Sequence, residues 1–342
     1  MLYPLQRRLL HWYSIFLSGA ILVLICSGGL VTSHGAGMAV PDWPNSFGYN
    51  MFMFPISRWI GGVFFEHTHR LIASAVGLFT LILFGLTWIF EDRRWVRWLA
   101  GIAVLAVVVQ GIIGGLRVTE HNALLGLFHG CLAQGFFSLA AVIALVTSPL
   151  WPRLGAVSNS RDLRIIRFWT VIVTGMIFVQ LILGASMRHS HTGLAIPDFP
   201  TVYGGVLPPM DSAAIASINQ SRSQSPTTSG LILLQFIHRV WAVFVVMGVA
   251  SAGVAVYLQR LLPPIVRKSG LVWLGFVMMQ FGLGAWTIWS NKAADIATAH
   301  VLFGALILGL GVLLSVVLSR VVRQALHPEQ DPVRSGLREL SV

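Results

Sequence analysis

The stretch with the clearest capacity for chemistry is Glu66–Arg70 (EHTHR), which lies just inside the start of a long apolar run. A carboxylate, imidazoles and a guanidinium are costly to place in lipid, so at this depth they indicate a functional site. On a helix, Glu66 and His69 share one face, and Arg70 lies one turn from Glu66. The same dipeptide recurs at His238-Arg239, again near the start of an apolar run.

The composition predicts a polytopic membrane protein. Of the 342 residues, 56% are hydrophobic and 10% are charged, whereas soluble proteins carry roughly 25% charged residues. Arg7-Arg8 precede an apolar run that is long enough to span a bilayer and lacks a convincing processing site, so we expect no cleaved signal peptide. Cys26 and Cys131 both lie in apolar segments. We therefore expect no disulfide in an outer loop and no cysteine cluster for a metal.

Eight apolar runs predict an all-α protein with eight transmembrane helices. The expected spans are 12–33, 63–90, 98–116, 123–147, 166–187, 231–259, 270–290 and 296–319. Lysine and arginine are strongly biased to the side that holds the N-terminus, with sixteen on that side against five on the other. The positive-inside rule then predicts that both termini are cytoplasmic, and it accounts for the net charge of +11 without nucleic acid. The five residues on the outer side are Arg58, Arg117, Arg188, Arg222 and Lys292.

An internal repeat divides the chain into two halves. Gly28–Val31 and Gly37–Pro44 match Gly184–Met187 and Gly193–Pro200 at an offset of 156, and Gln110–Gly115 matches Gln280–Ala285 at an offset of 170. The change of offset locates an insertion in the polar segment 211–229, which we expect to be a flexible loop. Each half holds four spans, so the halves have the same orientation. The prediction is two tandem four-helix bundles, at 1–150 and 160–323, with a polar cytoplasmic tail at 324–342.

Four histidines lie inside spans at corresponding places of the repeat: His69, His129, His238 and His300. Each is six or seven residues from the outer end of its span, about 10 Å deep at the rise of a helix. Two imidazoles at one depth on neighbouring helices are the arrangement that ligates a haem iron axially. The alternatives are hydrogen-bonded contacts between helices, or a metal alone, which is disfavoured because no cysteine or further carboxylate accompanies either pair.

The residues next to these histidines suggest different roles for the two halves. Arg70 and Arg239 are candidates to bind haem propionates, and Arg70 is equally placed for an intrahelical pair with Glu66. Where the first half has Glu66, the second has Gln235, an amide that cannot titrate. We therefore expect the first half to be the reactive one. The alternative is that Glu66 caps the start of its helix.

The outer loops carry paired Pro-Asp-aromatic-Pro segments around Asp42 and Asp198. These segments are predicted to be rigid and non-helical and to lie over the haem pockets as lids. The two aspartates are expected to cap turns rather than to act in catalysis. Gly114-Gly115 and the equivalent Gly284-Ala285 suit either close helix packing or the flat approach of a porphyrin. The remaining outer histidines are expected to be solvated loop residues: His34, His67, His121, His189 and His191.

The sequence resembles the haem A synthase family over about residues 5–322. The segments that resemble it are Glu66–Arg70, Gly114–Thr119 (GGLRVT), Gly29–Ser33 (GLVTS) and Ala39–Pro44 (AVPDWP), together with single histidines on the fourth, sixth and eighth spans. Some members have a cysteine pair in the first outer loop, which this sequence lacks.

The resemblance implies oxidation of the C8 methyl of haem O to a formyl group, giving haem A for cytochrome c oxidase. It implies that Glu66, His69 and His129 form the reactive site and that His238 and His300 ligate a permanent haem b. Either dioxygen or water supplies the oxygen. Expected partners are the lipid-soluble haem O, a haem O synthase, an electron acceptor and possible further copies of the chain, in the cell membrane with the haem sites toward its outer face.

Two other functions remain open on the sequence. A di-haem electron-transfer protein would use the same four histidines, although haems at one depth make a poor relay across a membrane. A two-repeat transporter is a third reading, disfavoured because the long spans are not broken at mid-membrane.

Overall fold

The computed structural model describes residues 5–155, 160–222 and 226–326. Nine helices lie in this part of the chain: α1 (Leu5–Ser33), α2 (Gly61–Phe90), α3 (Arg94–Thr119), α4 (Ala123–Val146), α5 (Arg161–His189), α6 (Ser212–Ser221), α7 (Ser229–Leu258), α8 (Pro264–Trp289) and α9 (Ala294–Leu326). All except α6 are long and apolar enough to cross a membrane, which confirms the predicted all-α fold with eight spans. Of the predicted tail, residues 327–342 lie outside the described residues.

Several helices begin earlier than hydropathy predicts. α1 starts at Leu5 instead of residue 12, α5 at Arg161 instead of 166, and α8 at Pro264 instead of 270. The side chain of Ser160 accepts a hydrogen bond from the backbone of Leu163 and so begins α5 within a charged segment. Hydropathy marks only the apolar part of each helix, whereas the helical backbone continues through the polar turns that precede it.

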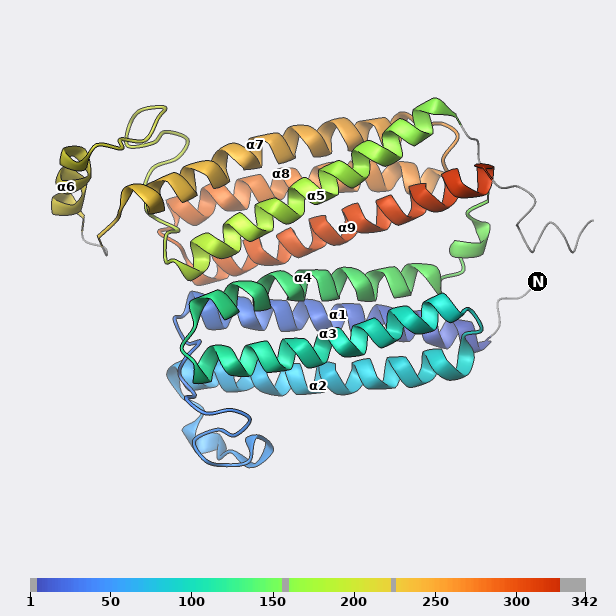
Figure 1. Cartoon of the computed structure of the whole chain (residues 1–342), viewed down its shortest axis with the longest axis horizontal. Helices are drawn as coiled ribbons and strands as arrows, with labels where there is room; N and C mark the ends of the chain where they lie inside the picture. The colour runs from blue at the N-terminus through green and yellow to red at the C-terminus, as the bar shows by residue number, and fades with distance from the viewer. Residues whose placement is uncertain (1–4, 156–159, 223–225, 327–342) are drawn as a thin grey trace, which may run out of the picture.

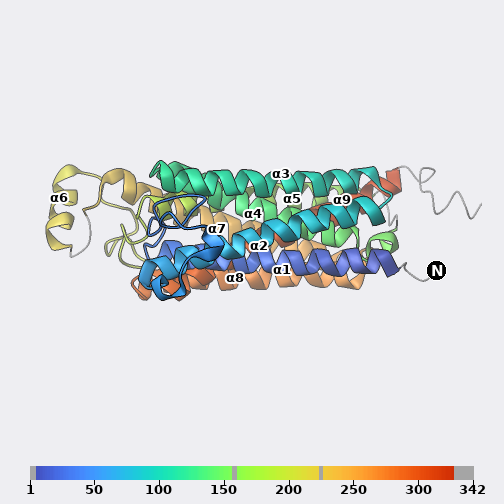
Figure 2. The same ribbon diagram turned by 90° about the horizontal axis from the view of Figure 1, so that it is seen from below.

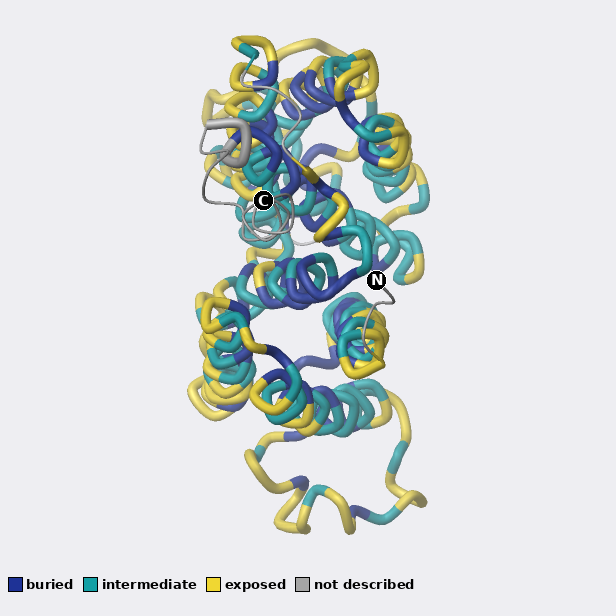
Figure 3. The backbone as a smooth tube through the Cα atoms, turned by 90° about the vertical axis from the view of Figure 1, so that its right-hand side faces the viewer, coloured by how far each residue is buried: buried dark blue, intermediate teal, exposed yellow. Residues whose placement is uncertain are grey.

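The long helices pack as two groups of four (Figure 1). In one group, α1 and α3 each contact both α2 and α4; in the other, α7 and α9 each contact both α5 and α8. The groups meet where α9 contacts α1 and α4, and where α4 contacts α5. The view along the helices separates the two groups clearly (Figure 3).

Close helix packing marks the inside of the group formed by α5, α7, α8 and α9. Gly253 of α7 and Gly270 of α8 approach so closely that a Cβ on either would lie within 2.6 Å of the other's carbonyl oxygen. The indole of Trp273 is fully buried and donates to the carbonyl of Ile307, at 2.9 Å. Small residues and interhelical hydrogen bonds are the means by which helices associate in lipid, where apolar burial against lipid tails gives little gain.

One end of the molecule carries residues 34–60 and α6, and we call it the loop end (Figures 1 and 2). The segment 211–229 differs from the prediction of a flexible loop, because Ser212–Ser221 form the helix α6. Asp211 starts this helix by accepting a hydrogen bond from the backbone N–H of Ala214. The serine-rich composition of this segment did not indicate a helix, although Asp211 is a typical N-cap residue.

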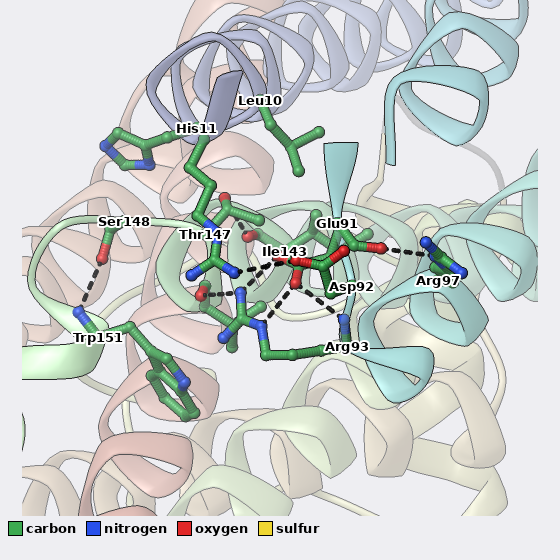
Figure 4. Close-up of polar contacts among 12 residues, drawn as sticks. Leu10, His11, Glu91, Asp92, Arg93, Arg97, Ile143, Thr147, Ser148 and Trp151 are labelled. Carbon is green, nitrogen blue, oxygen red and sulfur yellow. Dashed lines mark hydrogen bonds and ion pairs between the residues drawn. The ribbon is translucent and has the colours of Figure 1, made fainter. Parts of the chain in front are cut away.

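At the opposite end, a buried carboxylate joins three helices (Figure 4). Glu91, which follows α2, is fully buried and accepts from Nε and Nη2 of Arg93 at 2.8 and 2.6 Å. Arg93 also donates to the carbonyl of Val146 in α4, and Arg97 of α3 donates to the carbonyl of Glu91. Burial raises the pKa of Glu91, but the hydrogen bonds and charge of Arg93 outweigh it, so the pKa lies below its ordinary value of 4.5.

Replacement of Glu91 by glutamine is therefore expected to lower stability by about 3 kcal/mol, because Arg93 loses a bidentate partner at a buried site. Since the folded pKa is depressed, this stabilisation is present above about pH 4.5 and is lost as the pH falls through the folded value. Thermal unfolding in detergent between pH 4 and pH 7 measures both effects. If Glu91→Gln retained the wild-type melting temperature at pH 7, the pair would have no stabilising role.

Candidate functional site

The four histidines lie at the loop end, on the helices that begin there. His69, His129, His238 and His300 stand six to nine residues after the first residues of α2, α4, α7 and α9, which is about 9–14 Å along each helix. The rings of His69 and His129 lie edge to face, with centroids 6.5 Å apart and an interplanar angle of 75°. Each group of four helices therefore contains one histidine pair.

Each histidine ring packs against a glycine of a neighbouring helix. A Cβ placed on Gly28, Gly114, Gly184 or Gly284 would lie 3.0, 3.0, 3.1 or 3.2 Å from the Cε1 atom of His69, His129, His238 or His300, respectively. All four contacts obey the internal repeat. Gly114 and Gly284 were predicted to serve either close helix packing or the approach of a porphyrin. In the structure, both pack against the edge of an imidazole ring.

The spacing of the first histidine pair fits an iron porphyrin. Nδ1 of His129, His238 and His300 is buried without a hydrogen-bond partner among the described residues, whereas Nδ1 of His69 is bonded to Oγ of Ser27 at 2.7 Å. An iron held at about 2 Å from a nitrogen of each of two rings requires ring centroids about 6 Å apart. The 6.5 Å between His69 and His129 is compatible with that requirement, and imidazole is a usual axial ligand of haem iron.

Glu66 holds the loop that follows α1. It is 4% exposed; Oε2 accepts from the backbone N–H of Val40 at 2.9 Å, and Oε1 accepts from Arg70 at the same distance. In the second half, Oε1 of Gln235 accepts from the backbone N–H of Ile196 at 2.7 Å. The carboxylate and the amide therefore make the same contact at equivalent loop positions. The alternative that Glu66 caps α2 is wrong, because the helix begins at Gly61.

The two arginines that follow the histidines also hold these loops. Arg70 donates to the carbonyls of Val40, Asp42 and Asn45 and pairs with Glu66. These four acceptors match the four N–H bonds of its terminal nitrogens. The predicted intrahelical pair is thus present. No terminal N–H group of Arg70 remains to bind a propionate.

Arg239 repeats this arrangement with fewer partners. It donates to the carbonyls of Ile196 and Thr201 and lies over the ring of Phe199. Its Nε is buried without a partner among the described residues. Propionate binding by Arg239 stays a prediction.

The aspartates of the two loops bind turns, as predicted. Asp42 accepts from the backbone of Phe47 and Gly48, and Asp198 accepts from that of Tyr203 and Gly204. Burial raises the pKa of each aspartate, but these hydrogen bonds outweigh it and the net pKa is below its ordinary value. A carboxylate committed to two backbone N–H groups in this way is structural.

The loop after α1 lies against the end of α3. The indole of Trp43 packs so closely on Gly115 that a Cβ there would lie 2.3 Å from Cδ2 of the ring. Gly115 directly follows Gly114, which contacts His129. The loop therefore reaches the helix turn that supports the first histidine pair, consistent with a lid over that site.

Gly115→Ala is expected to displace this loop, because the added methyl overlaps the indole. It is expected to reduce the conversion of haem O to haem A, the reaction that the resemblance implies, by about tenfold. The double variant Gly115→Ala/Trp43→Phe is expected to restore most of the loss, since the second half has alanine and phenylalanine at the equivalent positions 285 and 199. Activity and limited proteolysis of the loop measure the effect. An unaffected Gly115→Ala variant would remove the loop from any part in the site.

Two of the outer histidines are not solvated, contrary to the prediction. His67 is fully buried, hydrogen-bonded to Ser46 and packed against the rings of Phe54 and Trp59. His189 is partly buried and lies against Gly126 of α4. The other three, His34, His121 and His191, are exposed. Apolar rings from the loop form a small core around His67 that hydropathy cannot reveal.

Two arginines near the histidines were counted above only as charges of the outer side, and the sequence pattern did not identify them as site residues. Arg117 and Arg188 lie in the last turns of α3 and α5, and both are partly buried. The signal was present in the repeat, because the equivalent positions are Thr287 and Thr32. Residues that break a repeat at its functional end were candidates for a function of one half alone.

Comparisons with known proteins identify the family of the chain. Residues 60–312 match the model of the family COX15-CtaA, described as cytochrome oxidase assembly protein. The chain is 24% identical over 340 residues to the haem A synthase of Geobacillus kaustophilus, covering 97% of this chain and 96% of the relative. It is 28% identical over 261 residues to the haem A synthase of Shouchella clausii, covering 70% and 83%. It is 23% identical over 302 residues to that of Bacillus cereus, covering 87% and 89%.

The family model covers well over half of the chain, including all four histidines and Glu66. The alignment with the relative from Geobacillus kaustophilus extends over nearly the whole length of both proteins. The chain belongs to the cytochrome oxidase assembly protein family that contains the haem A synthases.

Proposed function

We propose that this membrane protein is an oxidoreductase that converts haem O to haem A by oxidising the C8 methyl to a formyl group. The observation that supports this most directly is that only the first of the two equivalent histidine sites has a carboxylate, at position 66. Glu66 stands beside the first pair and Gln235 beside the second. A protein that only transfers electrons has no need of a titratable carboxylate beside one of its two histidine pairs.

The first half is the proposed conversion site. His69 and His129 hold the iron of the substrate haem, and bound iron supplies the redox chemistry. Glu66 is held in place by Val40 and Arg70 at the start of the same helix face as His69. From this position it accepts protons released at the methyl carbon or stabilises positive charge that develops there.

The second half is the proposed site of a resident haem b, held by His238 and His300. Gln180 of α5 donates to the carbonyl of His238, and both histidine rings rest on glycines. With the amide of Gln235 in place of a carboxylate, this site has no equivalent proton acceptor. It serves electron transfer or structural support for the first half.

The proposed setting follows from the same features. A haem with an isoprenoid chain is lipid-soluble, so it enters from the bilayer, and a haem O synthase is the enzyme class that supplies it. The bias of lysine and arginine supports an orientation with both termini in the cytoplasm and the loop end outside. An electron acceptor removes the electrons released by oxidation of the methyl group.

Extraction and chromatography of the haems tests the proposal. The protein is purified from cells that supply haem O, and the extracted haems are separated. Haem B together with haem O or haem A is the expected result. Haem B alone, at two per chain, would overturn the proposal in favour of a di-haem electron-transfer protein. His121→Ala, which changes a histidine at an exposed position, is a matched control and is expected to bind the same haems as the wild-type protein.

A further inference from the structure

Arg117 is a partly buried cation whose guanidinium makes no hydrogen bond within the described residues. Its guanidinium lies between the first loop and α4. A Cβ on Gly37 of the loop would lie 2.5 Å from Nη2, and one on Gly126 of α4 would lie 3.0 Å from Nε. Nε is buried and lacks an acceptor among the described residues. A guanidinium in such a place is costly unless an anion accompanies it.

The surroundings of Arg117 are mostly cationic or neutral. The charge of Arg117 is close enough to interact electrostatically with Glu66, His69 and His129, and also with Arg188 and His189. The carboxylate among these groups, Glu66, is already bonded to Val40 and Arg70. Arg117 and Arg188 therefore lie within electrostatic range of each other, and the one carboxylate in this set is already bonded to other groups.

Arg188 approaches the same region from the second half. It donates to the carbonyl of Gly29 and to Oγ of Ser33 in α1, at 2.5 and 2.8 Å. It is also in electrostatic contact with His300. Arg188 thus lies at the junction of the halves at the loop end, where α1 meets α9.

Neither arginine has an equivalent in the other half. Threonine occupies the positions that correspond to Arg117 and Arg188 in the repeat. By contrast, Arg70 and Arg239 are equivalent to each other and make equivalent loop contacts, to the carbonyls of Val40 and Ile196. The repeated arginines serve the loops that both halves share, and the unrepeated arginines are free to serve one site.

We propose that Arg117, supported by Arg188, binds the propionate carboxylates of the haem held by His69 and His129. A guanidinium and a carboxylate form paired, charge-assisted hydrogen bonds, and the two propionates supply the missing negative charge. The location at the loop end, between the first loop and the start of α4, places this site beside the first histidine pair. This inference rests on the proposed haem site of the first half and replaces Arg70 as its propionate ligand.

Haem titration of the purified full-length protein, with haem b retained in the second half, tests the proposal. The probes are iron protoporphyrin IX and its dimethyl ester, which lacks the propionate charges, and binding is followed by absorbance. Arg117→Gln is expected to weaken binding of the free acid by about ten- to hundredfold. It is expected to leave binding of the ester unchanged, and Arg117→Lys is expected to recover part of the loss.

Arg58→Gln is the matched control, because Arg58 is an exposed arginine of the first loop. Unchanged binding of the free acid by Arg117→Gln, or equal losses for acid and ester, would overturn the propionate assignment. Retention of haem b in each variant reports that the fold is intact. If the His69→Ala variant bound the added haem as the wild-type protein does, the haem site of the first half would itself be absent. That result would overturn the proposed function and this inference together.

Discussion

Glu66→Gln is expected to abolish conversion of haem O to haem A while both haem sites remain occupied. The chain itself shows that the amide fits the structural position, because Gln235 accepts from the loop N–H of Ile196 as Glu66 accepts from that of Val40. The variant removes the titratable group and one acceptor of Arg70, which keeps its three loop carbonyls. Loss of a positioned proton acceptor lowers rates by about 10²–10⁴-fold.

The measurement is the ratio of haem A to haem O extracted from the variant, with haem content per chain as the control for folding. The reciprocal variant Gln235→Glu is expected to leave conversion unchanged, because the resident haem is not the substrate. A Glu66→Gln protein that still formed haem A at the wild-type rate would confine Glu66 to holding the loop.

His69→Ala and His238→Ala are expected to have opposite effects on the bound haems. His238→Ala removes a ligand of the resident site, so the purified protein loses its tightly held haem b. His69→Ala removes a ligand of the substrate site, so haem b stays, haem O is not retained and haem A formation stops. Each alanine also leaves a void next to Gly184 or Gly28, which the ring edges otherwise fill.

Absorbance spectra of the reduced proteins, with chromatography of the extracted haems, measure these effects. His121→Ala changes a histidine exposed at the same end and is expected to leave both haems in place. If His69→Ala lost haem b and His238→Ala retained it, the roles of the two halves would be exchanged.

The sequence by itself determined the eight spans, the repeat and the four histidines. These features follow from local patterns: long apolar runs, fixed offsets, and polar residues that lipid does not tolerate without a function. The contacts of Asp42 and Asp198 were also predictable, because aspartate in a turn commonly binds nearby backbone N–H groups.

Only the tertiary structure decided what the charged residues near the histidines contact. Arg70 was equally compatible with a propionate and with Glu66, and the loop that folds back onto α2 supplies the carbonyls that occupy it. His67 is buried by rings of that loop, and Arg117 meets Gly37 and Gly126 from segments distant in sequence. Such contacts depend on how loops and helix ends come together in space, and neither hydropathy nor the repeat records that.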